Sequence, residues 1–340
     1  MGVNISPLIS QFKHPIKFSD LRNKVIAIDA YNAIYQFLTT IRDQTGRPLR
    51  DSSGRITSHL SGLFYRNVNL LKERIKLVYV FDGKPPARKI KELEKRKVLK
   101  EESYQKYLKA LERKDYEEAK RYAALAATLE PYMVEDAKKL LQLLGIPVVQ
   151  APSEGEAQAS YLAMKGDAWA AGSQDYDAFL FGSPRIVRNI TLTGKIRYPS
   201  KGVEVKLEPE VIYLDEVLKS LRITREQLVD IAILIGTDYN EGIKGIGPKR
   251  ALELIRTYKS IDRIPDIRRI LTKDEIDEIR SLFLNPEVTD DYKLEFKDPD
   301  YDGIIDFLCG EHDFSESRVK KALNELKNAL SIKGLDQWFR

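Results

Sequence analysis

Seven acidic residues stand where their side chains could together bind divalent metal ions, and they are Asp29, Asp82, Glu154, Glu156, Asp175, Asp177 and Asp238. Short apolar runs at 25–28, 77–81 and 168–172 come shortly before four of them. Such continuous apolar runs are typical of buried parallel strands. Because ligands of open α/β sheets bind beyond the carboxyl ends of the strands, we expect these strands to deliver their carboxylates to one edge.

A carboxylate cluster at such an edge predicts metal-assisted hydrolysis of a phosphodiester. Two divalent ions can generate hydroxide from water and stabilise the leaving oxygen. An all-oxygen ligand set suits Mg²⁺ or Mn²⁺ rather than zinc or iron. Without cations, carboxylates so close together would repel one another and some of their pKa values would rise, so we expect bound ions rather than bare acids.

Each acidic residue taken alone has a simpler interpretation. Asp and Glu make up 51 of the 340 residues, so an Asp-x-Asp pair can arise by chance. Asp29 or Asp82 alone could cap a turn or a helix after a strand. The run Ser153-Glu154-Gly155-Glu156 predicts a capping box, with Ser153 as N-cap and Glu156 at N3, which is compatible with metal binding. The metal interpretation therefore depends on the repetition at strand ends.

The surrounding elements predict a mixed α/β fold with a central, mostly parallel sheet. Strands are expected at 25–29, 77–82, 146–150 and 168–172, with short strands within 185–198. Apolar spacing and helix start or stop signals predict helices at 31–42, 60–71, 131–145, 208–221, 224–235, 249–258 and 315–329, and another that begins near Glu154. The segment 43–55 is expected to be a polar loop, and the chain beyond 259 is less regular until the last helix.

Residues 84–122 hold far more Lys and Arg than Asp and Glu. Sparse apolar positions predict one or two exposed helices, which could face phosphates or form a solvated hairpin. The local excess of positive charge is larger than the net +5 of the whole chain, which favours the phosphate-facing interpretation. Lys89 and Arg96 are two helical turns apart, so they share a face from which cations could steady a scissile phosphate.

The glycine-rich run 242–250 predicts a contact with a nucleic-acid backbone. Gly245 and Gly247 permit tight turns, and Pro248 suits the first position of the helix that follows. Backbone N–H groups at that helix start would face a phosphate, and Lys249 and Arg250 add positive charge. The run resembles the helix–hairpin–helix class, which grips DNA without reading bases, although an ordinary glycine-rich loop has a similar pattern.

Composition narrows the class of protein. No run approaches the roughly 18 apolar residues of a membrane span, and no secretory signal is visible. The single cysteine, Cys309, leaves no internal disulfide and fits a reducing compartment. His14, His59 and His312 are too far apart in sequence for metal-ligand spacing. The first six residues match a myristoylation pattern, which we interpret as coincidence because no polybasic segment follows.

Together these motifs identify the chain as similar to a known family. It resembles the flap endonucleases of the structure-specific 5′ nuclease family, of the archaeal type, nearly end to end. The segments that carry the resemblance are 25–30, 35–38, 78–86, 151–157, 175–177, 181–184, 234–239 and 245–250. Among them are Asp175-Tyr176-Asp177 and Gly245-Ile246-Gly247-Pro248-Lys249-Arg250, in the order that the family has.

The resemblance implies roles for the residues of the site. All seven acidic positions match family ligands, some through water, for two Mg²⁺ ions, with Mn²⁺ able to substitute. By this match Asp29, Asp82 and Glu154 lie nearer one ion, and Glu156, Asp175, Asp177 and Asp238 lie nearer the other. Lys89 and Arg96 match basic residues that help the cleaved phosphate. Tyr35 matches the aromatic residue on which a base stacks.

The same resemblance implies how DNA would be held. Residues 84–130 match a helical arch over the 5′ flap. Residues 242–258 match a helix–two-turn–helix that binds the duplex, often with a monovalent cation. Gly2, after loss of Met1, matches an N-terminus near the DNA junction. Arg42, Thr57 and Arg66 match positions near a 3′-flap pocket.

The last residues resemble the tail with which this family binds a sliding clamp of the PCNA type. That tail has Gln, an aliphatic residue three positions on, and then two aromatic residues. Leu335, Trp338 and Phe339 fit this pattern, but Ile332 stands in place of Gln, so the contact usually made by Gln is in question. The long basic tail of eukaryotic members is absent, which argues against nuclear targeting. Because no secretory signal is visible either, we expect a cytoplasmic protein.

The expected organisation is an N-terminal nuclease region at 1–100, the arch at 84–130, an internal nuclease region at 120–260, a C-terminal helical region at 261–330 and the clamp-binding tail at 331–340. The expected function is that of a 5′ flap endonuclease with 5′–3′ exonuclease activity, in Okazaki-fragment maturation and base excision repair, with branched DNA as substrate and no membrane partner. Three alternatives stay open: a related 5′ nuclease with another junction preference, a non-catalytic scaffold joining DNA to a clamp, and a haloacid-type phosphatase. The seven carboxylates argue against a scaffold, and a phosphatase leaves the duplex motif without a role.

Overall fold

The computed structural model describes residues 2–331 except 44–45, 114, 192–194, 199–202 and 207. Its centre is a seven-stranded sheet with the strand order β1-β9-β6-β5-β2-β3-β4. These strands are β1 (His14–Pro15), β2 (Val25–Asp29), β3 (Lys76–Phe81), β4 (Val148–Gln150), β5 (Ala170–Gly172), β6 (Arg185–Arg188) and β9 (Glu210–Tyr213). A separate antiparallel pair consists of β7 (Lys195–Tyr198) and β8 (Val203–Lys206).

The strands from β6 to β4 run parallel to one another, while β9 and β1 add antiparallel pairings at one edge. The central strands β2, β3 and β5 are buried on both faces of the sheet, which is why they are almost wholly apolar. In β2, Ile26 and Ile28 pack into the core on one face and Ala27 into the core on the other. The structure confirms the predicted mixed α/β class with a mostly parallel sheet.

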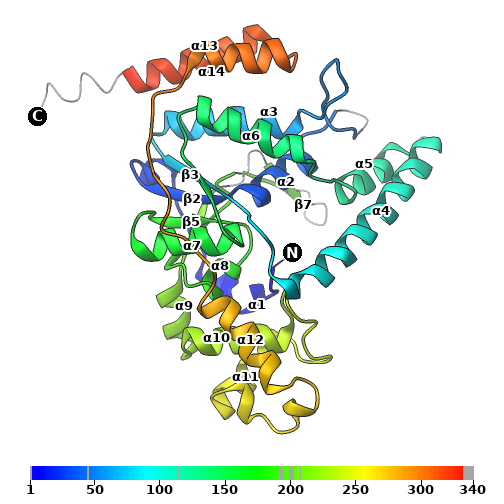
Figure 1. Ribbon diagram of the computed structural model, residues 1–340, viewed down its shortest axis with the longest axis vertical. Coiled ribbons are helices and arrows are strands. Elements are labelled where there is room, and N and C mark those ends of the chain that lie inside the picture. The colour runs from blue at the N-terminus through cyan, green and yellow to red at the C-terminus, as the bar shows by residue number, and fades with distance from the viewer. Residues whose placement is uncertain are drawn as a thin grey trace, which may run out of the picture.

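Helices cover both faces of the sheet (Figure 1). On one side lie α2 (Ala30–Thr40), α3 (Ser58–Lys72) and α6 (Pro131–Leu143), with α13 (Tyr301–Ile305) packed outside α6 and α14 (Glu316–Ser331) packed outside α3. On the other side lie α1 (Ser6–Ile9), α7 (Gly155–Lys165), α8 (Asp177–Leu180), α9 (Leu214–Leu221) and α10 (Arg225–Ile235), and α11 (Pro248–Tyr258) and α12 (Lys273–Leu284) pack on α10 further from the sheet. Short helical turns lie at η1 (Ser10–Phe12), η2 (Phe18–Leu21), η3 (Ala87–Lys89), η4 (Ile261–Arg263), η5 (Ile267–Arg269) and η6 (Asp306–Glu311).

The charged segment after β3 forms two helices, α4 (Ile90–Glu112) and α5 (Tyr116–Leu125), that project from the body of the protein (Figure 1). The side chain of Asp115 caps the start of α5 by accepting the N–H of Glu118. Of the α4 side chains, only Ala110 is buried. The prediction of one or two exposed charged helices is confirmed, and there are two. Nowhere in the described ranges is a helix both long and apolar enough to cross a membrane.

Two of the expected elements were wrong. The segment predicted as a helix at 208–221 begins as strand β9 and becomes helical only at Leu214. Val211 and Ile212 are buried and pair with β6, so sheet pairing outweighs the helical pattern of this segment. The region beyond 259 is more regular than expected, because α12 begins with a capping box between Thr272 and Glu275.

Candidate active site

The parallel strands bring acidic residues to one edge of the sheet. β2 ends at Asp29, while Asp82 and Asp175 follow the ends of β3 and β5. β2 pairs in parallel with both of these neighbours, so the three carboxyl ends lie side by side. The predicted placement of these carboxylates is confirmed, and Asp177 joins them as the first residue of α8.

Glu154 and Glu156 reach the same region from the start of α7, which packs against β2, β3 and β5. The predicted capping box is wrong: the N-cap of α7 is Glu154 rather than Ser153, and the side chain of Glu154 does not cap the helix. Glu156 instead accepts a hydrogen bond of 2.7 Å from the hydroxyl of Ser173, just after β5. Its carboxylate is therefore directed at the strand edge and not at its own helix end.

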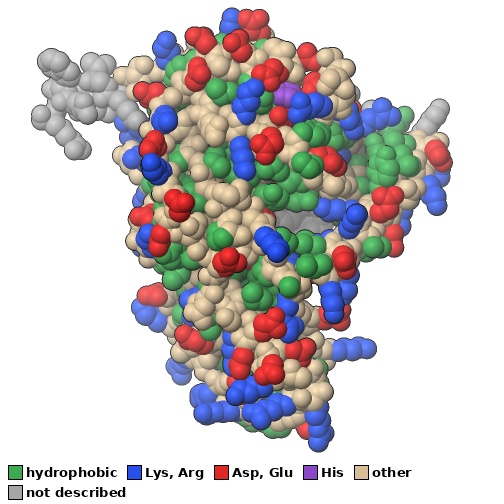
Figure 2. Space-filling view, viewed as in Figure 1, with side chains coloured by type: hydrophobic (Ala, Val, Ile, Leu, Met, Phe, Trp, Pro, Cys, Tyr) green, Lys and Arg blue, Asp and Glu red, His purple; other side chains and the backbone are tan. Residues whose placement is uncertain are grey.

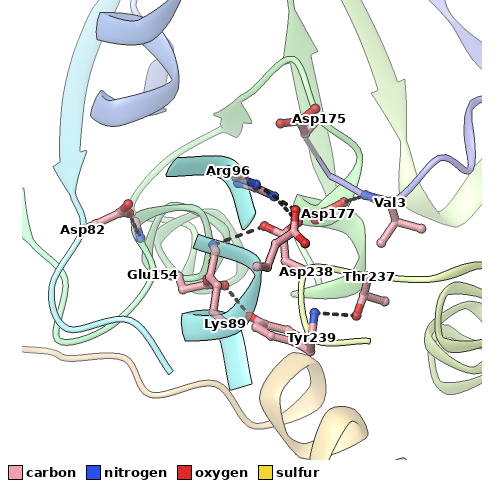
Figure 3. A network of polar contacts seen from close by, with 12 residues as sticks. Val3, Asp82, Lys89, Arg96, Glu154, Asp175, Asp177, Thr237, Asp238 and Tyr239 are labelled. Atoms are coloured by element: carbon pink, nitrogen blue, oxygen red, sulfur yellow. Dashed lines mark hydrogen bonds and ion pairs between the residues drawn. The ribbon is translucent and has the colours of Figure 1, made fainter. Parts of the chain in front are cut away.

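Asp238 enters the site from a tight turn after α10. Gly236 ends this helix with φ +112°, in a region that other residues rarely adopt. The turn is closed by a hydrogen bond from the N–H of Thr237 to the carbonyl of Asn240. This geometry places Asp238 near Asp177 and the adjacent Tyr239 beside Glu154 (Figure 3).

Burial and mutual repulsion raise the pKa values of several of these carboxyl groups. The pKa of Asp29 rises to about 7, first through burial and then through the charge of Asp82. The pKa of Asp177 also rises to about 7, mainly through burial, with Asp175 and Asp238 adding to the effect. Burial and neighbouring carboxylates raise the pKa of Glu156 in the same way. The carboxyl groups thus behave as one electrostatic unit that favours added positive charge.

Backbone N–H groups hold three of the carboxylates in place. Asp29 accepts from Asn32 at 3.0 Å, Asp82 from Gly155 at 2.6 Å and Asp177 from Val3 at 2.7 Å. The last contact packs the N-terminus of the chain against the site. A Cβ atom on Gly2 would lie only 2.5 Å from a carboxylate oxygen of Asp177, so this approach requires glycine.

Two cations from η3 and α4 enter the cluster. Lys89 forms ion pairs with Glu154 and, at 3.4 Å, with Asp238, and Arg96 of α4 also pairs with Asp238 (Figure 3). Although burial opposes the charged form of Lys89, its carboxylate partners raise its pKa. The predicted shared face of Lys89 and Arg96 is confirmed, since both side chains reach the same carboxylate.

The chemistry of these residues fits divalent cations. In the described part of the chain, no three acidic or histidine side chains converge tightly enough to hold an ion as they stand. Lys89 pairs with a carboxylate oxygen of Glu154, and Arg96 with one of Asp238. The donors are nevertheless all oxygens, and burial together with neighbouring carboxylates raises the pKa values of Asp29 and Asp177 to about 7, so a cation would favour their charged forms. Both features suit Mg²⁺ or Mn²⁺.

Tyr35 lies on α2 and contacts α4. Its hydroxyl accepts a hydrogen bond of 2.9 Å from Lys100 of α4, and the same ammonium lies 4.3 Å from the centre of the tyrosine ring. Lys100 thus covers one face of the ring through a cation–π contact. An aromatic surface beside a cation is suited to a nucleotide base and its phosphate.

The glycine-rich run leads into α11 as predicted. Gly247 is the N-cap and Pro248 the first helical residue, while Gly245 has φ +87°. Lys249 and Arg250 are exposed in the first turn. Lys and Arg side chains gather over the lower end of the molecule in Figure 2, where Figure 1 places α11. This end therefore presents helix N–H groups and positive charge together, away from the acidic cluster.

The residues matched to a 3′-flap pocket do not join this cluster. The guanidinium of Arg42 donates to the carbonyls of Thr39, Gly46 and Ala123, linking α2 to α5. Arg66 is buried and donates to the carbonyl of Ile190 at 2.6 Å, and burial lowers its pKa to about 10. Thr57 is buried before α3. Their contact with DNA stays a prediction, and the clamp-tail residues Ile332, Leu335, Trp338 and Phe339 lie outside the described residues.

The sequence interpretation missed several polar partners of the carboxylates. Ser173 donates to Glu156, and Asn32 donates to Asp175 at 3.3 Å. Tyr239 donates its hydroxyl hydrogen bond to Glu154. Each partner except Ser173 is more than eighty residues from its carboxylate, so no local spacing could indicate the pairs.

The sequence matches the XPG N-terminal domain over residues 1–103 and the XPG I-region over residues 145–238. It is 57% identical over 345 residues to flap endonuclease 1 of Pyrococcus abyssi, covering 100% of this chain and 98% of that protein. The matched regions contain all seven acidic residues as well as Lys89 and Arg96.

Solved structures of nucleases are also similar to this chain. Flap endonuclease-1 from Methanococcus jannaschii matches with a TM-score of 0.76 at 48% identity, over 98% of this chain and 100% of that one. The catalytic core of Rad2 in complex with DNA substrate matches with a TM-score of 0.70 at 25% identity, over 96% of this chain and 100% of that one.

Proposed function

The chain belongs to the flap endonuclease family of DNA nucleases, and we propose that it hydrolyses phosphodiesters at 5′ flap junctions with the aid of two metal ions. The observation that carries this proposal is the meeting of strand-end carboxylates with cations from the base of the arch. Lys89 and Arg96 lie on the arch side of the cluster, and Asp29 and Asp175 lie on the sheet side. A phosphate between them would meet positive charge from both the ions and the arch.

The seven acidic residues would hold two Mg²⁺ ions, for which Mn²⁺ can substitute, and the ions would activate water and stabilise the leaving oxygen. Side chains of the protein would bind the scissile phosphate and the neighbouring base. Lys89 and Arg96 would exchange their carboxylate partners for oxygens of the scissile phosphate. Tyr35 would stack on a base next to that phosphate, with Lys100 moving from its ring.

The remaining surfaces would hold the branched DNA. The α11 motif would bind the duplex by its phosphates, with a monovalent cation at its turns, and the arch of α4 and α5 would accommodate the 5′ flap. Gly2 would lie near the junction, because it packs against Asp177. Arg42, Thr57 and Arg66 would lie near a 3′ flap. We assign the enzyme to Okazaki-fragment maturation and base excision repair, with exonuclease action at nicks and gaps.

The proposed specificity is tested with three labelled substrates of equal length, a 5′ flap, a blunt duplex and a single strand, in Mg²⁺. We expect rapid cleavage of the flap near the junction and much slower cleavage of the other two, because only the flap engages both α11 and the arch. Equal rates on all three substrates would contradict a structure-specific nuclease. Preference for a different branched junction would favour a related 5′ nuclease instead.

The duplex motif leads to a prediction about salt. Replacing both Lys249 and Arg250 by Ala should weaken flap binding and reduce the slope of log affinity against log salt by about 2, since each phosphate contact contributes about 0.9. The cleavage rate at saturating enzyme should change little. Lys219→Ala with Arg222→Ala removes the same charge from the exposed end of α9 and is the matched control. A salt slope that is equal in both double variants would exclude α11 from the interface.

The tail leads to a prediction about a partner. Deleting residues 331–340 should leave basal flap cleavage unchanged and abolish stimulation by a PCNA-type clamp. Trp338→Ala with Phe339→Ala should do the same, because adjacent aromatic residues at a chain end are natural anchors for a hydrophobic pocket. The simpler alternative is that they pack on this chain, in which case the truncated protein should melt at a clearly lower temperature. If stimulation by the clamp survives truncation, the clamp binds elsewhere on the protein. The Ile332 that stands in place of Gln would then explain why the tail does not bind the clamp.

A further inference from the structure

Tyr239 contacts Glu154 but has no role in the proposed hydrolysis as described above. Its ring is 6% exposed and lies beside the acidic cluster, and its hydroxyl donates a hydrogen bond to Oε2 of Glu154 (Figure 3). The ring packs 5.0 Å from that of Phe283 in α12, and Phe283 packs 5.1 Å from Phe181. The aromatic side chain is thus fixed by the core and presents only its polar end to the site.

The backbone around Tyr239 is also held firmly. Its N–H donates to the hydroxyl of Thr237 at 3.0 Å, and that hydroxyl donates to the side chain of Asn240 at 2.8 Å. The amide of Asn240 in turn donates to the carbonyl of Ile233 at the end of α10. The phenol therefore stands on a turn with little freedom, which is what a residue that orients another side chain requires.

The two oxygens of Glu154 have partners of different kinds. Oε1 pairs with Lys89, which enters from the base of the arch, whereas Oε2 accepts from Tyr239, which belongs to the body of the protein. When Lys89 turns to a phosphate, Oε1 becomes available while Oε2 stays bound.

We propose that Tyr239 is a positioning residue, whose hydroxyl holds Oε2 of Glu154 so that Oε1 faces a divalent cation when Lys89 leaves. The inference rests on the proposed function, because it takes Glu154 to be a metal ligand. Hydrogen bonds to a ligating carboxylate fix its orientation, and their loss weakens metal binding. Tyr239 also stands just before Gly242, where the duplex motif begins, so the same turn connects Glu154 with the DNA-binding element.

The test measures the binding of Mn²⁺ alone to the DNA-free protein. Electron paramagnetic resonance reports the concentration of free Mn²⁺ during the titration. Tyr239→Phe removes one hydroxyl and keeps the ring packed on Phe283. We expect its Mn²⁺ affinity to fall by about tenfold, the lower end of such effects. Tyr161→Phe is the matched control, since Tyr161 makes the same kind of contact, to Asp290, away from the site. It should bind Mn²⁺ like the unchanged protein.

Two further measurements separate the possible outcomes. Raising Mg²⁺ should restore the cleavage rate of Tyr239→Phe but not that of Glu154→Gln, because the former misplaces the carboxylate and the latter removes its charge. Weak Mn²⁺ binding by Glu154→Gln together with normal binding by Tyr239→Phe would overturn the inference and leave the proposed function intact. Normal binding by both variants would overturn the inference and the assignment of Glu154 as a ligand together.

Discussion

Replacing Asp175 by Asn should reduce the single-turnover rate of flap cleavage by more than about 10³-fold, a loss of roughly 4 kcal/mol of transition-state stabilisation. Asn has nearly the same shape as Asp but lacks the charge that would hold an ion. Affinity for the flap should stay nearly unchanged, because it depends on the duplex motif and the arch. Asp238→Asn should be equally inactive, although it also loses the ion pairs of Asp238 with Lys89 and Arg96.

Asp175 is the cleaner of the two positions. Its carboxylate accepts a hydrogen bond from the amide of Asn32, and its backbone N–H donates to the hydroxyl of Ser173, a contact that Asn would keep. Rates are measured with enzyme in excess, and affinity by fluorescence anisotropy of a labelled flap. Asp215→Asn, which removes an exposed carboxylate of α9, is the matched control and should cleave at the normal rate. A cleavage rate for Asp175→Asn within tenfold of the unchanged protein would exclude this carboxylate from the reaction.

Lys89→Ala should slow single-turnover cleavage by about 10²–10³-fold, in the range found when one preorganised charge-stabilising donor is removed. A single phosphate contact contributes little to a multi-contact interface, so binding should weaken only slightly. The charge that develops in the transition state, in contrast, is concentrated where Lys89 meets the cluster. Single-turnover rates at several saturating enzyme concentrations separate the two effects.

Lys91→Ala is the control for Lys89→Ala. It removes the same charge two residues further along, from an exposed position in the first turn of α4. It should match the unchanged protein in rate and should lose at most a little affinity. If Lys89→Ala also lost only affinity and cleaved normally at saturation, then the ion pair of Lys89 with Glu154 would be purely structural.

The strand-end part of the site could be predicted from the sequence because it depends on local patterns. Uninterrupted apolar runs indicated buried parallel strands, and parallel strands place their following residues at one edge. Asp29, Asp82 and Asp175 could therefore be grouped without knowledge of any contact. Lys89 and Arg96 could be paired for the same reason, since helical periodicity alone puts them on one face.

The predictions that were wrong concern local structure that is determined by contacts between distant segments of the chain. Ser153 and Glu156 have the spacing of a capping box, but Glu156 binds Ser173 after β5, and this tertiary contact outweighs the local pattern. β9 looked helical because its pairing with β6 and β1 is not visible in its own residues. The start of α12 did carry a local signal, Thr272 followed by Glu275 three residues later.

The most direct test of the account is a single experiment on metal dependence. A 5′-labelled flap is incubated with enzyme in excess, first with Mg²⁺, then with excess chelator, and then with Mg²⁺ restored. The account predicts cleavage near the junction with Mg²⁺, none with chelator while the flap stays bound, and full recovery when Mg²⁺ returns, because the carboxylate cluster acts only through the ions it holds. Turnover at the original rate in excess chelator would contradict it.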